Sequence, residues 1–286
     1  MEPGDDEPRR QTLLRPVKPF ESYIERHRTS KPGVYFYPVN LKGLLIDLDG
    51  TLYVGEEPID GAREAIEKLE SADLTLRYVT NTTRKPRRVI HEHLDSLGFE
   101  VEERQIFTPA IAAARLIGPK TCFPLVDESL LEDLATLTFT TKDPDYVLIG
   151  DLGEDFTYAR LNPAFRHLMN GADLVALQKN RYWRKPDGFA LDAGAFVAAL
   201  EYASGKAAAI VGKPEKSFFR LALGEMELEP HEAGMVGDDP ASDVAGARAA
   251  GLAGIQVKTG KYRSEDEVES DLALDSIAGL PEALGI

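Results

Sequence analysis

The most constraining feature of the sequence is an apolar run that ends abruptly in two carboxylates, at positions 44–52 (LLIDLDGTL). A run of this kind is typical of a strand in a parallel sheet that is buried on both faces. Residues two apart in a strand point to the same side, so Asp47 and Asp49 can reach one small volume. Two close carboxylates stay ionised only when a cation or hydrogen-bond donors offset their charge. Because open α/β sheets bind ligands at the carboxyl edge, the run predicts a charged site there.

The next strand along the chain also ends in polar residues. Apolar spacings of three and four predict a helix over 62–69, and a strand is predicted over 74–79. Strand, helix and strand in this order imply a right-handed crossover and a parallel sheet. The second strand ends in Thr80-Asn81-Thr82-Thr83, just before a predicted helix, where hydroxyl and amide groups can form an anion site. Simple capping of that helix is the alternative interpretation.

A second alternation of strands and helices begins near residue 119 and separates the first two polar clusters from the later ones. This arrangement indicates an inserted lid domain. Strands are predicted at 121–126, 146–150 and 174–177, and helices at 128–137, 161–169 and 191–202. The predicted domains are an N-terminal extension at 1–40, a first core part at 41–118, a cap at 119–205 and a second core part at 206–286. The proline-rich extension is given no catalytic role.

Two further polar clusters follow predicted strands after the insertion. Lys213 comes after an apolar strand that we expect to return to the core sheet, and its ammonium can neutralise a carboxylate and a phosphoryl oxygen. Asp238, Asp239 and Asp243 follow the next strand. Three carboxylates within six residues indicate a site for a hard cation such as Mg²⁺, which prefers oxygen ligands. Capping of the following helix by Ser242 or Asp243 is compatible with that interpretation.

One loop of the predicted cap is both basic and aromatic, at positions 179–185 (KNRYWRK). Such a loop can hold an anionic substrate over the active site, or it can simply close an interface, and the sequence leaves both open. The candidate residues of this loop are Lys179, Arg181, Tyr182 and Trp183.

The charge and cysteine content limit the partners. The formal net charge of −15 repels phosphate backbones and anionic membranes, so we expect no nucleic-acid or membrane partner and a small-molecule ligand instead. The single cysteine, Cys122, excludes an intrachain disulfide and agrees with a reducing compartment. No run is long and apolar enough to span a bilayer. We therefore expect a cytoplasmic protein.

The four polar clusters together, in this order, resemble the motifs of the haloacid dehalogenase superfamily. Asp47-Leu48-Asp49-Gly50-Thr51 resembles the first motif, Thr80 the second and Lys213 the third, and Gly237-Asp238 with Asp243 resembles the fourth. The insertion is similar to that of the type IIA branch, and the resemblance covers residue 41 to near the C-terminus. It implies a Rossmann-like parallel-sheet core with an inserted α/β cap domain of the C2 type.

The resemblance also implies a reaction, which is Mg²⁺-dependent hydrolysis of a small phosphorylated substrate through an aspartyl-phosphate. Asp47 would be the nucleophile and Asp49 the general acid and base. The implied roles of the other residues are phosphoryl binding by Thr80, Asn81 and Lys213, metal binding by Asp47, Asp49 and Asp238, and orientation of the metal shell or of Lys213 by Asp239 and Asp243. Caps of this branch often mediate homodimers, so a homodimer through the cap is a further expectation.

The sequence has two alternative interpretations besides a phosphatase. A carbon–halogen hydrolase also uses an aspartate nucleophile, but it needs neither Asp49 as an acid for the leaving group nor a metal cluster. A non-catalytic binding or scaffold protein on the same fold is the stronger alternative, because fold does not fix function. The sequence does not identify the substrate beyond favouring an anionic one.

Overall fold

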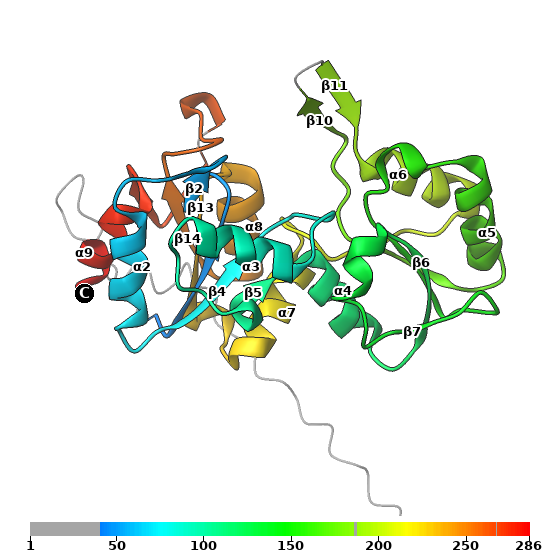
Figure 1. Cartoon of the computed structure of the whole chain (residues 1–286), viewed down its shortest axis with the longest axis horizontal. Coiled ribbons are helices and arrows are strands. Elements are labelled where there is room, and N and C mark those ends of the chain that lie inside the picture. The colour runs from blue at the N-terminus through cyan, green and yellow to red at the C-terminus, as the bar shows by residue number, and fades with distance from the viewer. Residues whose placement is uncertain (1–40, 186–187, 267) are drawn as a thin grey trace, which may run out of the picture. The chain divides into compact units, whose positions relative to one another are not determined.

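The computed structural model describes residues 41–185, 188–266 and 268–286, which all belong to one compact unit spanning 38–286. The predicted N-terminal extension at 1–40 lies outside the described residues. Among the described helices, none has the length and apolar character needed to cross a bilayer. Two larger sheets organise the described residues (Figure 1).

The first sheet has the strand order β15-β14-β13-β1-β4-β5, and each neighbouring pair is parallel. All five residues of β1 are buried, because β1 lies between β13 and β4 and is covered on both faces, as its apolar run predicts. The strands are β1 Gly43–Asp47, β4 Thr75–Val79, β5 Ile106–Phe107, β13 Ala233–Gly237, β14 Ala253–Val257 and β15 Leu272–Leu274. The parallel α/β fold class predicted from the sequence is confirmed.

Helices cover both faces of the first sheet. Successive residues of a strand point to opposite faces, and the apolar residues of β1 pack against helices on each side. Leu44 and Ile46 of β1 pack against α2, α3 and α9 on one face. Leu45, between them, packs against α4, α7 and α8 on the other face. These helices are α2 Ala62–Glu70, α3 Arg87–Ser96, α4 Pro109–Ile117, α7 Lys216–Met226, α8 Gly246–Ala250 and α9 Leu280–Leu284. We call this sheet and its helices the core.

The second sheet has the order β12-β9-β8-β6-β7 and is also parallel. Val147 and Ile149 of its strand β8 pack against helices α5 and α6. Leu148 faces the opposite way and joins the apolar cluster that contains α4. The elements are β6 Thr121–Leu125, β7 Thr138–Phe139, β8 Tyr146–Ile149, β9 Asp173–Ala176, β12 Ala209–Ile210, α5 Tyr158–Met169 and α6 Ala193–Ser204. We call this sheet and its two helices the cap.

The last cap strand corrects one expectation from the sequence. The strand before Lys213 was expected to return to the core sheet, but β12 pairs with β9 in the cap sheet, with Ala209 opposite Val175. The apolar run fits a parallel strand in either sheet, so periodicity could not decide between them. The cap sheet, as defined above, therefore includes Ala209 and Ile210. The division into separate core and cap domains stays a prediction.

Shorter elements lie between the main strands and helices. At two places the observed element differs from the predicted one. The helix predicted over 128–137 is only a short turn, η2 (Glu128–Leu131), and the basic and aromatic stretch that was predicted to be a loop forms an antiparallel hairpin of β10 and β11. The hairpin register pairs Tyr182 with Leu191. The remaining bounds are β2 Tyr53–Val54, β3 Glu57–Pro58, β10 Tyr182–Lys185, β11 Gly188–Leu191, η1 Glu103–Gln105, η3 Gly153–Asp155, η4 Pro230–Glu232, η5 Pro240–Ala245, η6 Ser264–Asp266 and η7 Ile277–Gly279.

Candidate active site

The carboxyl end of β1 delivers the first two predicted site residues. Asp47 is the last residue of β1 and is only 6% exposed, whereas Asp49, in the turn beyond, is exposed. Gly50 follows with a φ of +89°, and a Cβ there would lie 2.1 Å from Oδ2 of Asp238. Only glycine can meet both demands at once, so the sequence Asp-Gly brings the β1 turn into contact with the end of β13.

Lys213 connects the predicted carboxylates through two buried ion pairs. Its Nζ lies 2.5 Å from Oδ1 of Asp47 and 2.6 Å from Oδ1 of Asp243, and all three side chains are buried. Burial alone would lower the pKa of Lys213, but the charges of Asp243 and Asp47 outweigh it and raise that pKa. The ammonium therefore stays charged and holds Asp47 in place.

Asn81 fixes the backbone of Lys213. The Oδ1 of Asn81 accepts a hydrogen bond from the Lys213 N–H, and the Nδ2 of Asn81 donates one to the Lys213 carbonyl, both at 2.8 Å. The polar end of β4 is thus joined directly to the residue that follows the cap strand β12. The predicted role of Asn81 was phosphoryl binding, and the structure adds a second task, which is to position Lys213.

The carboxylates of the acidic cluster after β13 have different hydrogen-bond partners, which the sequence did not predict. Asp239 Oδ1 accepts from the N–H groups of Ala241 and Ser242, so Asp239 caps η5. The alternative that Ser242 or Asp243 caps the following helix is wrong, because α8 has Ala245 at its N-cap and no side-chain cap. Asp243 points back toward β13, and a Cβ on Gly237 would lie 2.2 Å from its Oδ2. Its two oxygens accept from the Asp239 N–H and from Lys213.

Asp238 presents a buried carboxylate oxygen that suits a cation. The side chain is fully buried, its Oδ2 accepts from the Lys261 N–H at 2.5 Å, and its Oδ1 has no hydrogen-bond partner among the described residues. Burial, and then the charge of Asp47, raise the pKa of Asp238. An unpartnered buried carboxylate oxygen is costly unless a cation meets it.

The donor set fits a hard divalent cation. One carboxylate oxygen from each of Asp47, Asp238 and Asp243 lies within 4.8 Å of the others. Oxygen-only ligands suit Mg²⁺, which binds through one or two carboxylates and keeps several waters. Both oxygens of Asp243 accept hydrogen bonds, from Lys213 and from the Asp239 N–H. Asp47 and Asp238 each use one oxygen in this way among the described residues, so they are the carboxylates with capacity for the ion.

Hydroxyl groups lie beside these carboxylates at the end of β4. Thr80 is 7% exposed, and its hydroxyl donates to the Thr82 hydroxyl at 3.0 Å while accepting from the Thr82 N–H at 3.1 Å. The buried Thr51 hydroxyl, after β1, has no hydrogen-bond partner among the described residues. Donors of this kind are available to an oxyanion that enters the site.

These side chains share one cavity of about 220 Å³. It brings together every predicted core residue except Asp238, which does not line it but accepts a hydrogen bond from Lys261, which does. The lining residues are Asp47, Asp49, Thr80, Asn81, Thr82, Asn180, Lys213, Asp239, Ser242, Asp243 and Lys261. A volume of this size accommodates a phosphoryl group and part of a leaving group.

The predicted cap-loop residues are mostly elsewhere. Lys179 Nζ pairs with Glu201 of α6 at 2.6 Å, and neither Arg181 nor Tyr182 lines the cavity. Trp183 belongs to β10, but its side chain lies outside the described residues. Among the described side chains of this loop, the one that lines the cavity is Asn180, which is neither charged nor aromatic.

Sequence reasoning also missed Lys261. It lies in the loop after β14, and the rule that places ligands at the carboxyl ends of parallel strands applies to this loop as it does to the others. Thr82 and Asn180 were present in motifs noted above but were not singled out, and Ser242 was considered only as a helix cap. Applying the edge rule to every core strand would have found Lys261.

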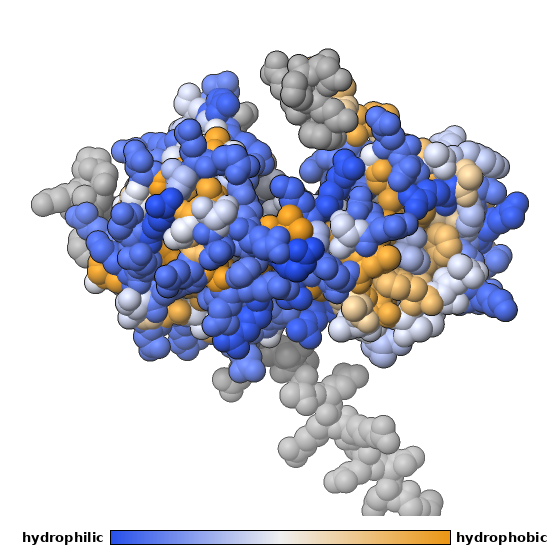
Figure 2. All heavy atoms as spheres, viewed as in Figure 1, coloured by the Kyte–Doolittle hydropathy of each residue, from blue (hydrophilic) through white to orange (hydrophobic). Residues whose placement is uncertain are grey.

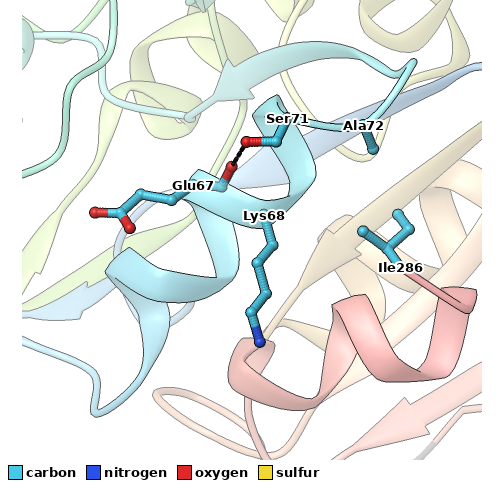
Figure 3. A pocket seen from close by; sticks show the side chains of 5 residues that line it. All are labelled: Glu67, Lys68, Ser71, Ala72 and Ile286. Atoms are coloured by element: carbon cyan, nitrogen blue, oxygen red, sulfur yellow. Dashed lines mark hydrogen bonds between the residues drawn. The ribbon is translucent and has the colours of Figure 1, made fainter.

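A larger cavity, of about 360 Å³, lies far from this chemistry (Figure 3). It is formed by the end of α2 and the C-terminal residue, where Ser71 donates a hydrogen bond to the Glu67 carbonyl. Figure 3 shows the Glu67 side chain pointing away from Ile286. With no set of converging polar groups, this cavity lacks the features of an active site.

Comparison with known protein families agrees with this geometry. The family model described as haloacid dehalogenase-like hydrolase matches residues 44–140, and a second model, described as HAD-hydrolase-like, matches 210–280. The two matches contain β1 and β4 in one segment and Lys213 and β13 in the other. The chain belongs to the haloacid dehalogenase-like hydrolases, as its four motifs predicted.

Particular relatives refine this assignment. Haloacid dehalogenase-like hydrolase domain-containing protein 2 of Mus musculus is 46% identical over 79% of this chain and 88% of its own length. Phospholysine phosphohistidine inorganic pyrophosphate phosphatase of Danio rerio is 37% identical over 86% of this chain and 94% of its own. The p-nitrophenyl phosphatase from Archaeoglobus fulgidus superposes with a TM-score of 0.78, at 27% identity, over 85% of this chain and 99% of that one.

Proposed function

We propose that this protein is a Mg²⁺-dependent phosphatase that hydrolyses a small phosphorylated substrate through an aspartyl-phosphate on Asp47. The observation that carries the proposal is the buried Lys213 ammonium, paired with Asp47 and Asp243, next to an Asp238 oxygen that has no partner among the described residues. This arrangement presents a fixed carboxylate beside a place for a cation. Relatives that are named as phosphatases support the same reaction class.

The first half of the reaction forms the covalent intermediate. A carboxylate oxygen of Asp47 attacks phosphorus, a new O–P bond forms, and the bond from phosphorus to the leaving oxygen breaks. Asp49, exposed at the mouth of the site, donates a proton to the leaving oxygen. Lys213 stays charged and offsets negative charge on Asp47 and on the phosphoryl oxygens.

The second half releases phosphate. Asp49, now a carboxylate, accepts a proton from a water molecule as that water attacks the phosphorus of the intermediate. The Asp47–phosphate bond breaks, inorganic phosphate leaves, and both aspartates return to their starting states. Thr80 and Thr82 supply hydroxyl groups to the phosphoryl oxygens in both halves.

The metal would be held by the carboxylates of Asp47 and Asp238 and by the main-chain carbonyl of Asp49. Bound there, a divalent cation offsets the charge between nucleophile and phosphoryl group. Asp243 would act through Lys213, and Asp239 through its cap of η5, which carries Asp243.

The cap would admit the substrate and limit water, with Asn180 as its contact to the site.

We extend the proposal to a homodimer that forms through the cap and to a location in the cytoplasm. Exposed apolar side chains of the cap support a self-association surface, and Figure 2 shows apolar patches over this half. Tyr202 and Leu191 are 94% and 66% exposed, respectively. Light scattering on the purified protein would measure the mass in solution.

The test of the function is hydrolysis of p-nitrophenyl phosphate by the purified chain, with and without Mg²⁺, beside Asp47→Asn. We expect Mg²⁺-dependent turnover that is lost in the variant. Asp73→Asn is the matched control, because Asp73 is exposed and remote from the cavity. Turnover that survives in Asp47→Asn would show that the nucleophile is another group. Absence of turnover over a screen of natural phosphates would instead favour a non-catalytic binding role.

A further inference from the structure

The mouth of the active-site cavity has a composition different from its floor. Asp47, Thr80, Lys213 and Asp243 are buried, and four other lining residues are partly buried. The exposed members are one carboxylate, one amide and one amine, supplied by Asp49, Asn180 and Lys261. In the proposed reaction the transferred phosphoryl group occupies the floor, so the leaving group must lie at this mouth.

The backbone around Lys261 is fixed tightly against the catalytic turn. The Lys261 N–H donates to Asp238 Oδ2, and the Thr259 hydroxyl donates to the Gly50 carbonyl. Gly260, between them, has a φ of +53°, and a Cβ there would lie 2.2 Å from Asp238 Oδ2 and 2.5 Å from the Cα of Gly50. The backbone of Lys261 therefore has a defined place against Asp238 and the β1 turn, although the side chain is exposed.

The Lys261 ammonium is attracted by the aspartates of the site. Desolvation alone would lower its pKa, but the charges of Asp47, Asp238, Asp239 and Asp243 raise it. Among the described residues the ammonium forms no ion pair within 4.0 Å, in contrast to Lys213, which forms two. Four of the lining residues are aspartates, and Lys213 and Lys261 are the cations among the described lining residues. A cation at an acidic mouth raises the local affinity for a ligand anion that the carboxylates would otherwise repel.

We propose that Lys261 is a specificity-determining residue that binds an anionic group, such as a carboxylate, on the leaving-group side of the substrate. The substrate class is then a phosphate ester whose leaving group is itself negatively charged. Asp49 protonates the leaving oxygen while the Lys261 ammonium contacts the anionic group farther along the same leaving group. This inference rests on the proposed phosphatase function for the position of the leaving group.

The test compares two phosphate esters that differ in one charge, phenyl phosphate and 4-carboxyphenyl phosphate. We expect the ratio of their kcat/KM values, anionic over neutral, to fall about five- to tenfold in Lys261→Gln, because one charge-assisted contact is lost at a partly exposed site. Lys261→Arg should keep the ratio, and Lys261→Glu should favour phenyl phosphate. The preference should weaken at high salt, since the contact is open to solvent.

Lys258→Gln is the matched control, because Lys258 is an exposed lysine of the same loop that does not line the cavity. It should leave the ratio unchanged. An unchanged ratio in Lys261→Gln would overturn the inference. So would an equal loss for both esters, which would mean that the ammonium acts on the transferred phosphoryl group.

A binding measurement separates this inference from the proposed function. The two esters are titrated calorimetrically with Mg²⁺ into Asp47→Asn and into Asp47→Asn/Lys261→Gln. If the wild-type protein hydrolyses neither ester but the ratio of Kd values still falls with Lys261→Gln, the function fails and the Lys261 site stands. If the ratio of Kd values does not move, the Lys261 site fails whether or not turnover is observed.

Discussion

The carboxyl edge of the core and the hairpin loop of the cap both carry charged residues, but they hold them very differently. At the core edge the buried charges meet from separate strand ends: Lys213 reaches Asp47 and Asp243, and Asn81 holds the Lys213 backbone. In the cap loop, Lys179 pairs with Glu201 of its own half, and Tyr182 is 56% exposed. The comparison teaches that charge alone does not mark a site, whereas charges that meet from separate elements do.

The largest expected effect is at the centre of the core network. Lys213→Met removes the cation from two buried carboxylates, so the free energy of unfolding should fall by about 3 kcal/mol or more, and turnover by roughly 10³-fold. Urea denaturation and p-nitrophenyl phosphate hydrolysis measure the two quantities. Lys258→Met, at an exposed position, should change neither. A Lys213→Met protein as stable as wild type would mean that the network does not hold the core edge together.

The next effect concerns the contact between the β14 loop and the β1 turn. Gly260→Ala should lower stability by about 1–3 kcal/mol and weaken Mg²⁺ binding, because the added methyl group would meet Asp238 and Gly50. Gly55→Ala is a close control, since Gly55 also has a positive φ, +63°, but has nothing within 4 Å of the added Cβ. Equal losses in the two variants would assign the effect to backbone strain and not to crowding at the site. Thermal unfolding with and without Mg²⁺ would measure this.

A smaller effect is expected at Asn81, which acts through Lys213. Asn81→Ala loses two hydrogen bonds to the Lys213 backbone, so we expect a loss of about 1–2 kcal/mol in stability and a fall in kcat of roughly tenfold. Asn81→Asp is the informative partner, because its carboxylate can still accept from the Lys213 N–H but cannot donate to the Lys213 carbonyl. If Asn81→Ala raises KM with kcat unchanged, direct substrate binding outweighs the positioning role.

The core edge was predictable from sequence because chain order and strand ends determine it. Asp47, Thr80, Lys213 and Asp243 each follow an apolar strand, and parallel strands end at one edge whatever their exact pairing. The sheet that takes up β12 was not predictable, since an apolar run pairs equally well in either sheet. Lys213 still lies at the edge of the core sheet although β12 belongs to the other sheet, because the residue lies beyond the strand and its backbone is held by Asn81.

The cap contact was not predictable for a different physical reason. Lys179 and Asn180 are neighbours in one loop. Which of them faces the cavity depends on hydrogen bonds of the loop backbone, and these cannot be predicted from the sequence. The Asn180 N–H bonds to the Gln178 side chain, and the Asn180 carbonyl accepts from the Gly194 N–H. Close packing allows only glycine at 194, where a Cβ would lie 2.3 Å from that carbonyl.

The smallest expected effect tests the cap side of the comparison. The ion pair of Lys179 with Glu201 is partly exposed, so Lys179→Gln should cost no more than about 0.5 kcal/mol in stability and leave kcat/KM within roughly twofold of wild type. Burial opposes ionisation of Glu201, but the hydrogen bonds from Lys179 and from the Ala208 N–H, together with the charge of Lys179, outweigh it and lower the pKa of Glu201. A lowered carboxyl pKa contributes stability at neutral pH that is lost as the pH falls through that pKa, so the difference between wild type and variant should vanish in acid. Urea denaturation at neutral and acidic pH, with steady-state kinetics, measures both. A large rise in KM for Lys179→Gln would instead show that this lysine leaves Glu201 to bind substrate. The cap loop would then contribute a charge to the site as the core edge does, and the contrast between the two regions would fail.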